Sequence, residues 1–408
     1  MVTVYRDGLC GDVLPFWLRH GWDRTHGGIF TGLDREGSLV DDSKSVWFQG
    51  TAAWMYATAF RLAESRFEWL ELAQSCVAFL RRHGAGPDGS YYFILSAEGR
   101  PRIRRHMFCE NYAALGYAAV AKVTGDRELA EEAWQAWELF LEQNFHPLDG
   151  SAKIVPVPRA TKRATPKLAA IATAQELRDL LGERSVRGGT CTQWIDWAIG
   201  ELARDFMKPE LEALVELVAR DGAMVDTFEG WQLDLGLTGK AAWFFLREAK
   251  FRGGDARLVD LGTTLLRWMW SRSWDADGGG LFSKMDVRGV SKQRFWHPTK
   301  CWWPHNMAIM TTLLAADLTG DGRYLDWHAQ VHDWAHAHFP DPEHGEWFGY
   351  LDRAGRPTSM RKGSMFKGPF HLPRMQLVCW KQLADPCFLA EPAGRTPAEG
   401  LSTNARSA

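Results

Sequence analysis

The sequence has no charge imbalance and no long apolar run. Its 48 lysines and arginines nearly balance 50 aspartates and glutamates, for a net charge of −2 over 408 residues. A nucleic-acid surface or a polybasic membrane patch needs a surplus of basic residues, which is missing. No stretch reaches the ~20 apolar residues that cross a bilayer, and the amino terminus lacks a signal-peptide pattern. We therefore expect a cytoplasmic protein with no nucleic-acid or membrane partner.

Cofactor signatures are also lacking. The seven cysteines are scattered without a CxxC pair, which favours reduced thiols. Phosphate-binding glycine loops and the GxSxG nucleophile motif are absent. His328, His332 and His336 recur every fourth residue and superficially resemble a zinc helix, but Asp333 stands where such a helix carries glutamate. We therefore expect neither a metal nor a cofactor.

What the sequence has in excess is tryptophan and glycine, with 21 and 39 residues. Many of these recur in one pattern: an aromatic lead-in, an Asp/Gly turn, more aromatic residues and a second turn. Such alternation with glycine turns predicts short β-hairpins. Six copies, about 60 residues apart, lie at residues 22–37, 86–99, 145–157, 219–227, 274–289 and 339–355.

The segments between these turns have helical periodicity. Residues 51–62, 111–123, 128–144 and 308–318 carry apolar side chains at i, i+3, i+4 and i+7. A unit of two helices and a hairpin cannot bury its apolar face alone, and six such units close into a ring. The sequence predicts an all-α fold, an (α/α)6 barrel with β-hairpins in its loops. One domain would span residues 1–388, followed by a disordered tail at 389–408.

The most informative motif for chemistry is KGPFHLPR at residues 367–374. His371 and Arg374 follow a Gly-Pro turn at the expected start of the last inner helix. There an imidazole could transfer a proton and a guanidinium could bind a hydroxyl or an anion in the central funnel. A buried histidine with purely structural hydrogen bonds explains the spacing equally well.

Several motifs together resemble the N-acylglucosamine 2-epimerase superfamily, which includes cellobiose 2-epimerases and mannose isomerases. They are HGWDRTHGGIFTGLDREG, DDSKSVWFQG, KCWWPHNMA, HGEWFGYLDRAG and KGPFHLPR. The motifs keep the family's order, and the resemblance covers nearly the whole chain. The resemblance implies an (α/α)6 barrel. It also implies proton transfer next to the carbonyl of an opened sugar, through an enediol, between two histidines. His371 and Arg374 match the family's FHxPR motif.

The chain departs from this family pattern at four polar positions. The second family histidine lies in a motif of the form NPGHxxExxW, and the matching residues 234–243 read DLGLTGKAAW. Leu237 replaces that histidine and Lys240 replaces the glutamate. Thr51 stands for the arginine of the QGR motif, and Met307 for a glutamate after Trp302-Trp303-Pro304. A one-base route through His371 remains open, as does a role for Lys240 as base or Schiff-base former.

The resemblance also suggests residues for substrate binding. Lys167, Lys240 and Lys300 fall where the family places funnel or rim residues, and three inward lysines would indicate an anionic ligand. Lysines on helices are more often simply solvated. Glu110 matches an acidic pocket position, and Trp47 and Trp303 are candidates for aromatic walls.

The leading hypothesis is a sugar 2-epimerase or aldose–ketose isomerase with His371 as general acid and base. Three alternatives stay open: a specialised reaction on a modified or anionic sugar or natural-product intermediate, an inactive sugar-binding family member, and a glycoside hydrolase. Hydrolysis would require two facing carboxylates, and Glu110 has no evident partner. Exposed aromatic loops are compatible with a homodimer.

Overall fold

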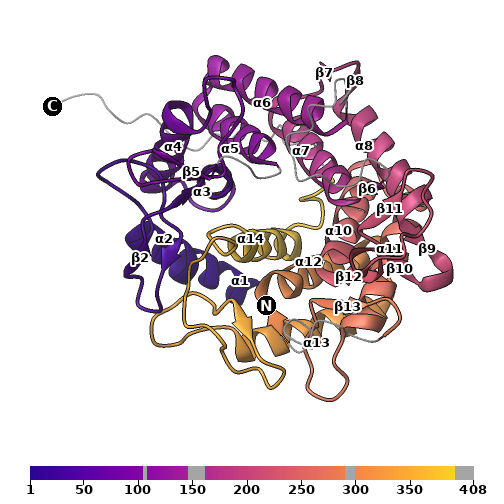
Figure 1. Cartoon of the computed structure of the whole chain (residues 1–408). Coiled ribbons are helices and arrows are strands. Elements are labelled where there is room, and N and C mark those ends of the chain that lie inside the picture. Colours follow the sequence, from indigo (N-terminus) through magenta and orange to yellow (C-terminus); the bar gives the residue numbers. More distant parts are fainter. Residues whose placement is uncertain (104–107, 146–160, 290–298, 391–408) are drawn as a thin grey trace, which may run out of the picture.

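The computed structural model describes residues 1–103, 108–145, 161–289 and 299–390, and most of these residues are helical (Figure 1). The helices form an inner and an outer set that alternate along the chain. The inner helices are α3 (Val46–Leu62), α5 (Cys109–Thr124), α7 (Thr165–Leu181), α10 (Leu235–Phe251), α12 (Trp302–Thr319) and α14 (His371–Ala384). The outer helices are α1 (Val2–Asp7), η1 (Gly8–Val13), α2 (Leu14–His20), α4 (Phe67–His83), α6 (Arg127–Phe145), α8 (Cys191–Glu201), α11 (Ala256–Ser273) and α13 (Gly322–His338).

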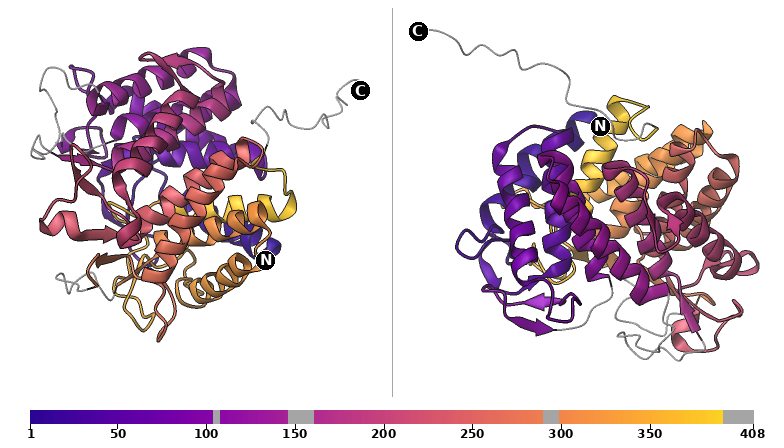
Figure 2. Two further views of the ribbon diagram at one scale, coloured as in Figure 1. Left: turned by 90° about the vertical axis from the view of Figure 1, so that its right-hand side faces the viewer. Right: turned by 90° about the horizontal axis from the view of Figure 1, so that it is seen from above.

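The inner helices contact one another in cyclic order. Helix α3 packs on α5, α5 on α7, α7 on α10, α10 on α12, α12 on α14, and α14 on α3. Each inner helix also packs on the outer helix beside it in sequence, except that α14 packs on α1 and η1 from the opposite end of the chain. Figure 2 shows the same assembly from two further sides. The described part of the chain is therefore a closed ring of helix pairs.

Small and apolar residues let the inner helices pack this closely. A methyl group on Gly50 of α3 would lie 2.0 Å from the carbonyl oxygen of Tyr112 on α5, so only glycine fits at this crossing. Helices α3 and α12 bury residues on all their faces, whereas outer helices such as α4 bury one stripe. The four helices expected from periodicity are present, and each is a few residues longer than its apolar pattern.

Short strands lie in the loops that lead from an outer helix to the next inner helix, except for one hairpin between α7 and α8. They are β1 (Gly32–Leu33), β2 (Leu39–Asp41), β3 (Lys44–Ser45), β4 (Ile94–Leu95), β5 (Pro101–Ile103), β6 (Thr161–Arg163), β7 (Ser185–Val186), β8 (Gly189–Thr190), β9 (Met207–Lys208), β10 (Ala213–Leu214), β11 (Leu217–Ala219), β12 (Gln232–Asp234), β13 (Lys284–Asp286), β14 (Lys300–Cys301) and β15 (Tyr350–Leu351). All the pairings are antiparallel. Strands β3, β6, β12 and β14 each lead into an inner helix and pair with a strand from another repeat.

The hairpin pattern expected from sequence appears at five of its six positions. Bridges join Trp22 to Ile29, Ala85 to Tyr91, Val218 to Met224, Trp274 to Leu281 and Pro340 to Trp347. The sixth expected copy, at residues 145–157, lies outside the described residues except for its first residue. Most of the expected tail, 391–408, also lies outside them.

Three of these turns share one ionic arrangement. An aspartate accepts hydrogen bonds from the backbone at the start of the turn, a glycine four residues later has φ between +66° and +79°, and a buried lysine from the following strand or loop contacts both. The lysine ammonium lies 2.7, 3.1 and 3.0 Å from the aspartate and also donates to the glycine carbonyl. The sets are Asp23, Gly27 and Lys44; Asp275, Gly279 and Lys300; and Asp341, Gly345 and Lys362. We call these three sets the Asp–Gly–Lys turns.

All seven cysteines are free thiols, and six of them are buried. Within the described residues, no helix combines the length and the apolar character needed to cross a membrane.

Candidate functional site

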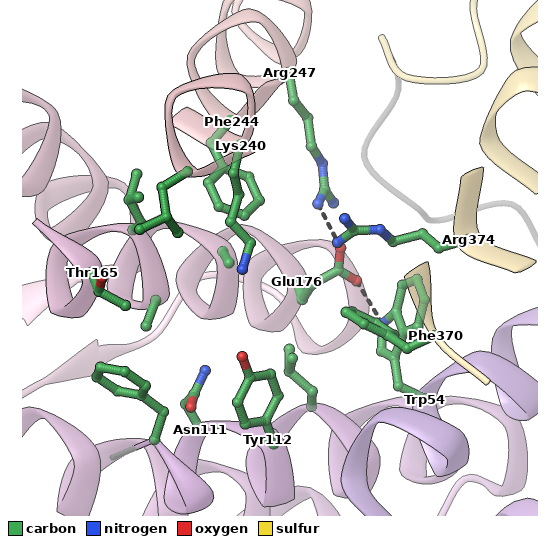
Figure 3. A pocket seen from close by; sticks show the side chains of 16 residues that line it. Trp54, Asn111, Tyr112, Thr165, Glu176, Lys240, Phe244, Arg247, Phe370 and Arg374 are labelled. Atoms are coloured by element: carbon green, nitrogen blue, oxygen red, sulfur yellow. Dashed lines mark hydrogen bonds and ion pairs between the residues drawn. The ribbon is translucent and has the colours of Figure 1, made fainter. Parts of the chain in front are cut away.

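A pocket lies between five of the inner helices (Figure 3). Its empty space is ≈ 620 Å³, including the part open to solvent. Described residues that line it come from α3, α5, α7, α10 and the start of α14: Trp54, Phe108, Asn111, Tyr112, Leu115, Thr165, Leu168, Ala169, Ala172, Glu176, Leu237, Lys240, Phe244, Arg247, Phe370 and Arg374. Apolar walls with a few polar groups are typical of a small-molecule site.

Helix α10 presents one face to the pocket. Leu237, Lys240, Phe244 and Arg247 follow one another at intervals of three and four residues, so they share one side of the helix. Asp234 begins the helix, and its Oδ1 accepts a hydrogen bond from the backbone of Leu237 at 3.1 Å. This cap fixes the first turn of α10, and Lys240 in the following turn points into the pocket (Figure 3).

The Lys240 ammonium has no hydrogen bond or ion pair with any residue that the structure describes. The Asp234 carboxylate, the nearby acid, does not pair with Lys240, and its Oδ1 caps the helix. Burial, together with the weaker effect of the positive charge of Arg374, lowers the pKa of Lys240 to about 8 against the opposing effect of Asp234. The ammonium is therefore still mostly protonated near pH 7.

Glu176 is the one carboxylate among the described lining residues, and both of its oxygens have partners. Oε2 accepts a hydrogen bond from Nε1 of Trp54 at 2.8 Å, and Oε1 forms an ion pair with Arg247 at 2.5 Å. Arg247 also pairs with Asp179 at 2.7 Å. A glycoside hydrolase requires two free carboxylates on opposite sides of its substrate, which this described lining does not provide.

Arg374 lies in the first turn of α14 and is 9% exposed. Its guanidinium lies 3.0 Å from the sulfur of Met307, and its Nε has no hydrogen-bond partner. Burial lowers the pKa of Arg374 to about 10, while Glu176 acts in the opposite direction. No carboxylate of the described residues lies within ion-pair distance of Arg374. The pocket therefore holds a second cation without an ionic partner.

His371 is the first residue of α14, between the two lining residues Phe370 and Arg374. It is 9% exposed, its ring centre lies 5.9 Å from that of Trp303, and its Nδ1 is buried without a hydrogen bond. Burial places the pKa of His371 well below its usual range, and the charges of Arg374 and Lys240 act in the same direction. The imidazole is therefore neutral at pH 7, and a neutral imidazole can accept a proton.

Helix α5 contributes polar groups from its first turn. Asn111 donates to Thr173 at 3.0 Å, and its Oδ1 is buried without a partner. The Tyr112 hydroxyl points into the same space as the Lys240 ammonium (Figure 3). Burial raises the pKa of Tyr112, so its hydroxyl stays protonated. Trp47 stacks on the Tyr112 ring at 5.0 Å and so supports this wall from behind.

The residues proposed from sequence do not all meet at this pocket. Lys240 and Arg374 line it, and His371 and Trp47 contact residues that do. Two other proposed residues, Lys167 and Glu110, are buried near the starts of α7 and α5 but are not among its described lining. The Lys167 ammonium donates a hydrogen bond to the carbonyl of Arg163 at 3.1 Å. Trp303, the last of the proposed residues near the pocket, packs beside the ring of His371.

Lys300 lies elsewhere in the fold. It is fully buried in the second Asp–Gly–Lys turn, where its ammonium donates hydrogen bonds to Asp275 and to the carbonyl of Gly279. The helix with the regularly spaced histidines is α13. There the Tyr5 hydroxyl lies 2.7 Å from Nδ1 of His332 and 3.3 Å from Nε2 of His328. No group of three potential metal ligands occurs within the described residues.

Sequence reasoning missed Trp54, Glu176 and Arg247, as well as Asn111 and Tyr112. A usable signal was present in α10, where Arg247 shares the face of Lys240 in an otherwise apolar stripe. A second was present in α7, where Glu176 lies on the face of Leu168, Ala169 and Ala172. Charged residues on the inner face of a buried helix indicate a polar cavity.

The fold and the pocket define a class: a helical ring protein with a pocket between its inner helices. The sequence model of the N-acylglucosamine 2-epimerase family matches residues 27–367. N-acylglucosamine 2-epimerase of Bos taurus is 32% identical over 96% of this chain and 92% of its own length, and that of Homo sapiens is 31% identical over 93% and 89%. The chain belongs to the N-acylglucosamine 2-epimerase family.

Solved structures show the same fold. Cellobiose 2-epimerase from Bacillus thermoamylovorans B4167 superposes with a TM-score of 0.81 at 17% identity, covering 93% of this chain and 99% of that one. A D-mannose isomerase superposes with a TM-score of 0.79 at 16% identity, covering 93% and 97%. The resemblance inferred from the motifs is confirmed.

Proposed function

We propose that this protein is a sugar isomerase or epimerase in which His371 moves a proton at the carbon next to the carbonyl group. The position of the neutral His371 imidazole carries the proposal: its ring packs on Phe370, which lines the pocket, and Arg374, three residues later in the same helix, lines the pocket as well. Family membership and the names of the relatives, which are sugar epimerases and an isomerase, support the same reaction class.

The chemistry follows from these groups. The opened sugar has an acidic C–H bond at C2, next to the C1 carbonyl. His371 takes the C2 proton, the electron pair of that bond forms the C1–C2 double bond, and the carbonyl oxygen becomes the negative oxygen of an enediolate. Arg374 is the cation placed to stabilise that oxygen. Proton return from the imidazolium to C1, with a proton shifting from O2 to O1, yields a ketose.

A single base on one face favours isomerisation over epimerisation. Inverting C2 requires a proton donor on the opposite face of the enediolate. The family pattern supplies a histidine for that step, and Leu237 lines the pocket in its place. No histidine belongs to the described lining, where Lys240, which is mostly protonated near pH 7, and the protonated hydroxyl of Tyr112 are the candidate donors of this proton.

We also propose that the ring is an (α/α)6 barrel. The cyclic contacts of α3, α5, α7, α10, α12 and α14 support it, as does the outer helix beside each of them. In such a barrel the pocket would be the central funnel.

Proton NMR in D2O tests the proposed reaction. We expect the enzyme to incorporate deuterium at C2 of its aldose substrate, with a ketose or the C2 epimer as product. His371→Asn should lower the exchange rate by about 10²–10⁴-fold, the usual contribution of a positioned proton-transfer group.

A histidine away from the pocket provides the matched control. His344→Asn changes a partly exposed histidine in a loop and should leave exchange unchanged. Circular dichroism and the melting temperature establish that both variants are folded. Binding of a sugar without any exchange would contradict the proposed reaction, and unaltered exchange in the folded His371→Asn variant would contradict the assignment of the base.

A further inference from the structure

We propose that the substrate of this pocket is a sugar that carries an acid group, and that the ammonium group of Lys240 binds that acid. That the substrate is a sugar rests on the proposed function, while the requirement for an acid group follows from the residues of the pocket. Three observations carry it: a lysine without a partner among the described residues, an excess of positive charge in the described lining, and polar groups beside that lysine.

The first observation is the position of Lys240. Among the described residues its ammonium neither donates a hydrogen bond nor forms an ion pair. Lys240 is partly buried, whereas Lys44, Lys300 and Lys362 are fully buried and find partners within the protein in the Asp–Gly–Lys turns. A charge taken out of water without a partner is costly, so the fold retains Lys240 at a cost that a ligand can offset.

The second observation is the charge of the lining. Lys240, Arg247 and Arg374 are cations, and Glu176 is the one acid in the described lining. Glu176 is already bound by Arg247 and Trp54. Lys240 on α10 and Arg374 on α14 therefore remain without a carboxylate partner among the described residues. A carboxylate, sulfonate or phosphate on the ligand supplies the missing charge.

Lys240 is the better of the two cations for binding the acid. The guanidinium of Arg374 is attracted by the charge of Glu176 and lies beside His371, where the proposed reaction develops negative charge. Lys240 has only Asp234 as a nearby acid, and Oδ1 of that residue caps α10. The acid group and the reacting carbon would thus lie at different parts of the pocket.

The third observation is the polar surroundings of Lys240. The Tyr112 hydroxyl points toward the same space, and Asn111 has a buried carbonyl oxygen without a partner (Figure 3). A protonated phenol can donate to an acid oxygen, and an amide oxygen can accept from a sugar hydroxyl. The surroundings of Lys240 therefore fit an acid group attached to a hydroxylated chain.

Matched sugar pairs test the inference with the whole protein. Glucuronate and glucose 6-phosphate carry an acid group, and glucose is their neutral counterpart. Inorganic phosphate supplies the acid without the sugar. We expect titration calorimetry to show that at least one acid-bearing sugar binds about tenfold to a hundredfold more tightly than glucose, the range of one charge-assisted hydrogen bond. The two acids distinguish a carboxylate site from a phosphate site.

Two variants assign the effect to Lys240. Lys240→Met and Lys240→Gln should each remove the preference for the acid-bearing sugar and leave the affinity for glucose within about twofold. Lys250→Met is the matched control, because Lys250 lies ten positions further along the same helix, paired with Asp317 at 2.8 Å outside the pocket lining. That control should retain the preference.

The outcomes separate this inference from the proposed reaction. Tight binding of an acid-bearing sugar without deuterium uptake supports the inference and overturns the reaction. Deuterium uptake with glucose at a rate equal to that with either acid-bearing sugar supports the reaction and overturns the inference. If both Lys240 variants still prefer the acid-bearing sugar, Lys240 does not bind the acid group. If inorganic phosphate binds as tightly as the acid-bearing sugars, the sugar part contributes nothing to binding, and the claim that the ligand is a sugar is wrong.

Discussion

Lys240 makes ligand binding depend on pH in a defined direction. Its pKa of about 8 is lowered mainly by burial. The other titratable groups that face it are Arg374, Asp234, His371 and Tyr112, and of the cations Lys240 loses its proton first as pH rises. An acid ligand binds the protonated form. Affinity for glucuronate should be constant below pH 7 and fall by about tenfold per pH unit well above 8.

Calorimetry between pH 6 and 9.5 measures this dependence. Glucuronate stays ionised throughout this window, since carboxyl groups titrate near pH 4. Lys240→Met should give a flat profile over the same range, while Lys250→Met should follow the parent protein. A parent profile without any decrease from pH 7 to 9.5 would show that the ligand does not bind the Lys240 ammonium.

Some site residues can be predicted from sequence and others cannot, for a physical reason. His371 and Arg374 lie in one local motif at a helix start, and Lys240 is conspicuous as a charged residue in an apolar stripe. The Glu176 carboxylate is held by hydrogen bonds from Trp54 and Arg247, which are 122 and 71 residues away in the chain. Such contacts arise only when helices distant in sequence are brought together by the ring.

At the scale of single elements, the Asp–Gly–Lys turns join each loop to the next strand or loop. The hairpins were predicted from their glycines and aromatic residues. The role of Lys300 was not, because its partner Asp275 lies 25 residues earlier and the intervening segment conceals the spacing. The family resemblance alone places Lys300 among the funnel or rim residues. Recognising that Lys44 follows Asp23 by 21 residues and Lys362 follows Asp341 by a similar interval would have revealed the repeat.

Breaking one Asp–Gly–Lys turn should destabilise the protein strongly. Lys300→Met leaves the buried Asp275 with one cationic partner fewer, since Arg353 at 2.8 Å is its other cationic partner in the described part of the chain. Removing one partner of a buried ion pair typically costs ~3–5 kcal/mol. We expect urea denaturation, followed by far-UV circular dichroism, to show a loss of this size in the free energy of unfolding.

An exposed pair provides the comparison for Lys300. Arg323 and Asp321 lie 2.8 Å apart, with side chains 48% and 41% exposed. Arg323→Met should cost at most ~1 kcal/mol, because water screens such pairs. Equal losses in Lys300→Met and Arg323→Met would show that the buried lysine contributes no more than a surface charge.

At the scale of the whole molecule, the two ends of the chain complete the ring. Helix α14 carries His371 and Arg374, and its outer neighbours are α1 and η1 from the amino terminus. The approach is close: a methyl group on Gly8 would lie 2.5 Å from Nε2 of Gln376. Sequence reasoning predicted six helix pairs but did not identify residues 2–20 as the last outer element. Those residues follow no turn motif, and only the closed ring shows which helix they cover.

This closure predicts that the amino-terminal helix affects both the stability of the ring and the pocket. Leu9 of η1 is fully buried, and Leu9→Ala should lower the free energy of unfolding by ~2–5 kcal/mol. Val4→Ala on the adjacent helix is the control, because Val4 is 46% exposed and such changes usually stay within about 0.5 kcal/mol. Urea denaturation followed by tryptophan fluorescence and by circular dichroism measures both. If Leu9→Ala behaves like Val4→Ala, the amino-terminal helix does not hold α14 in place, and the pocket wall that bears His371 must be supported by α12 and α3 alone.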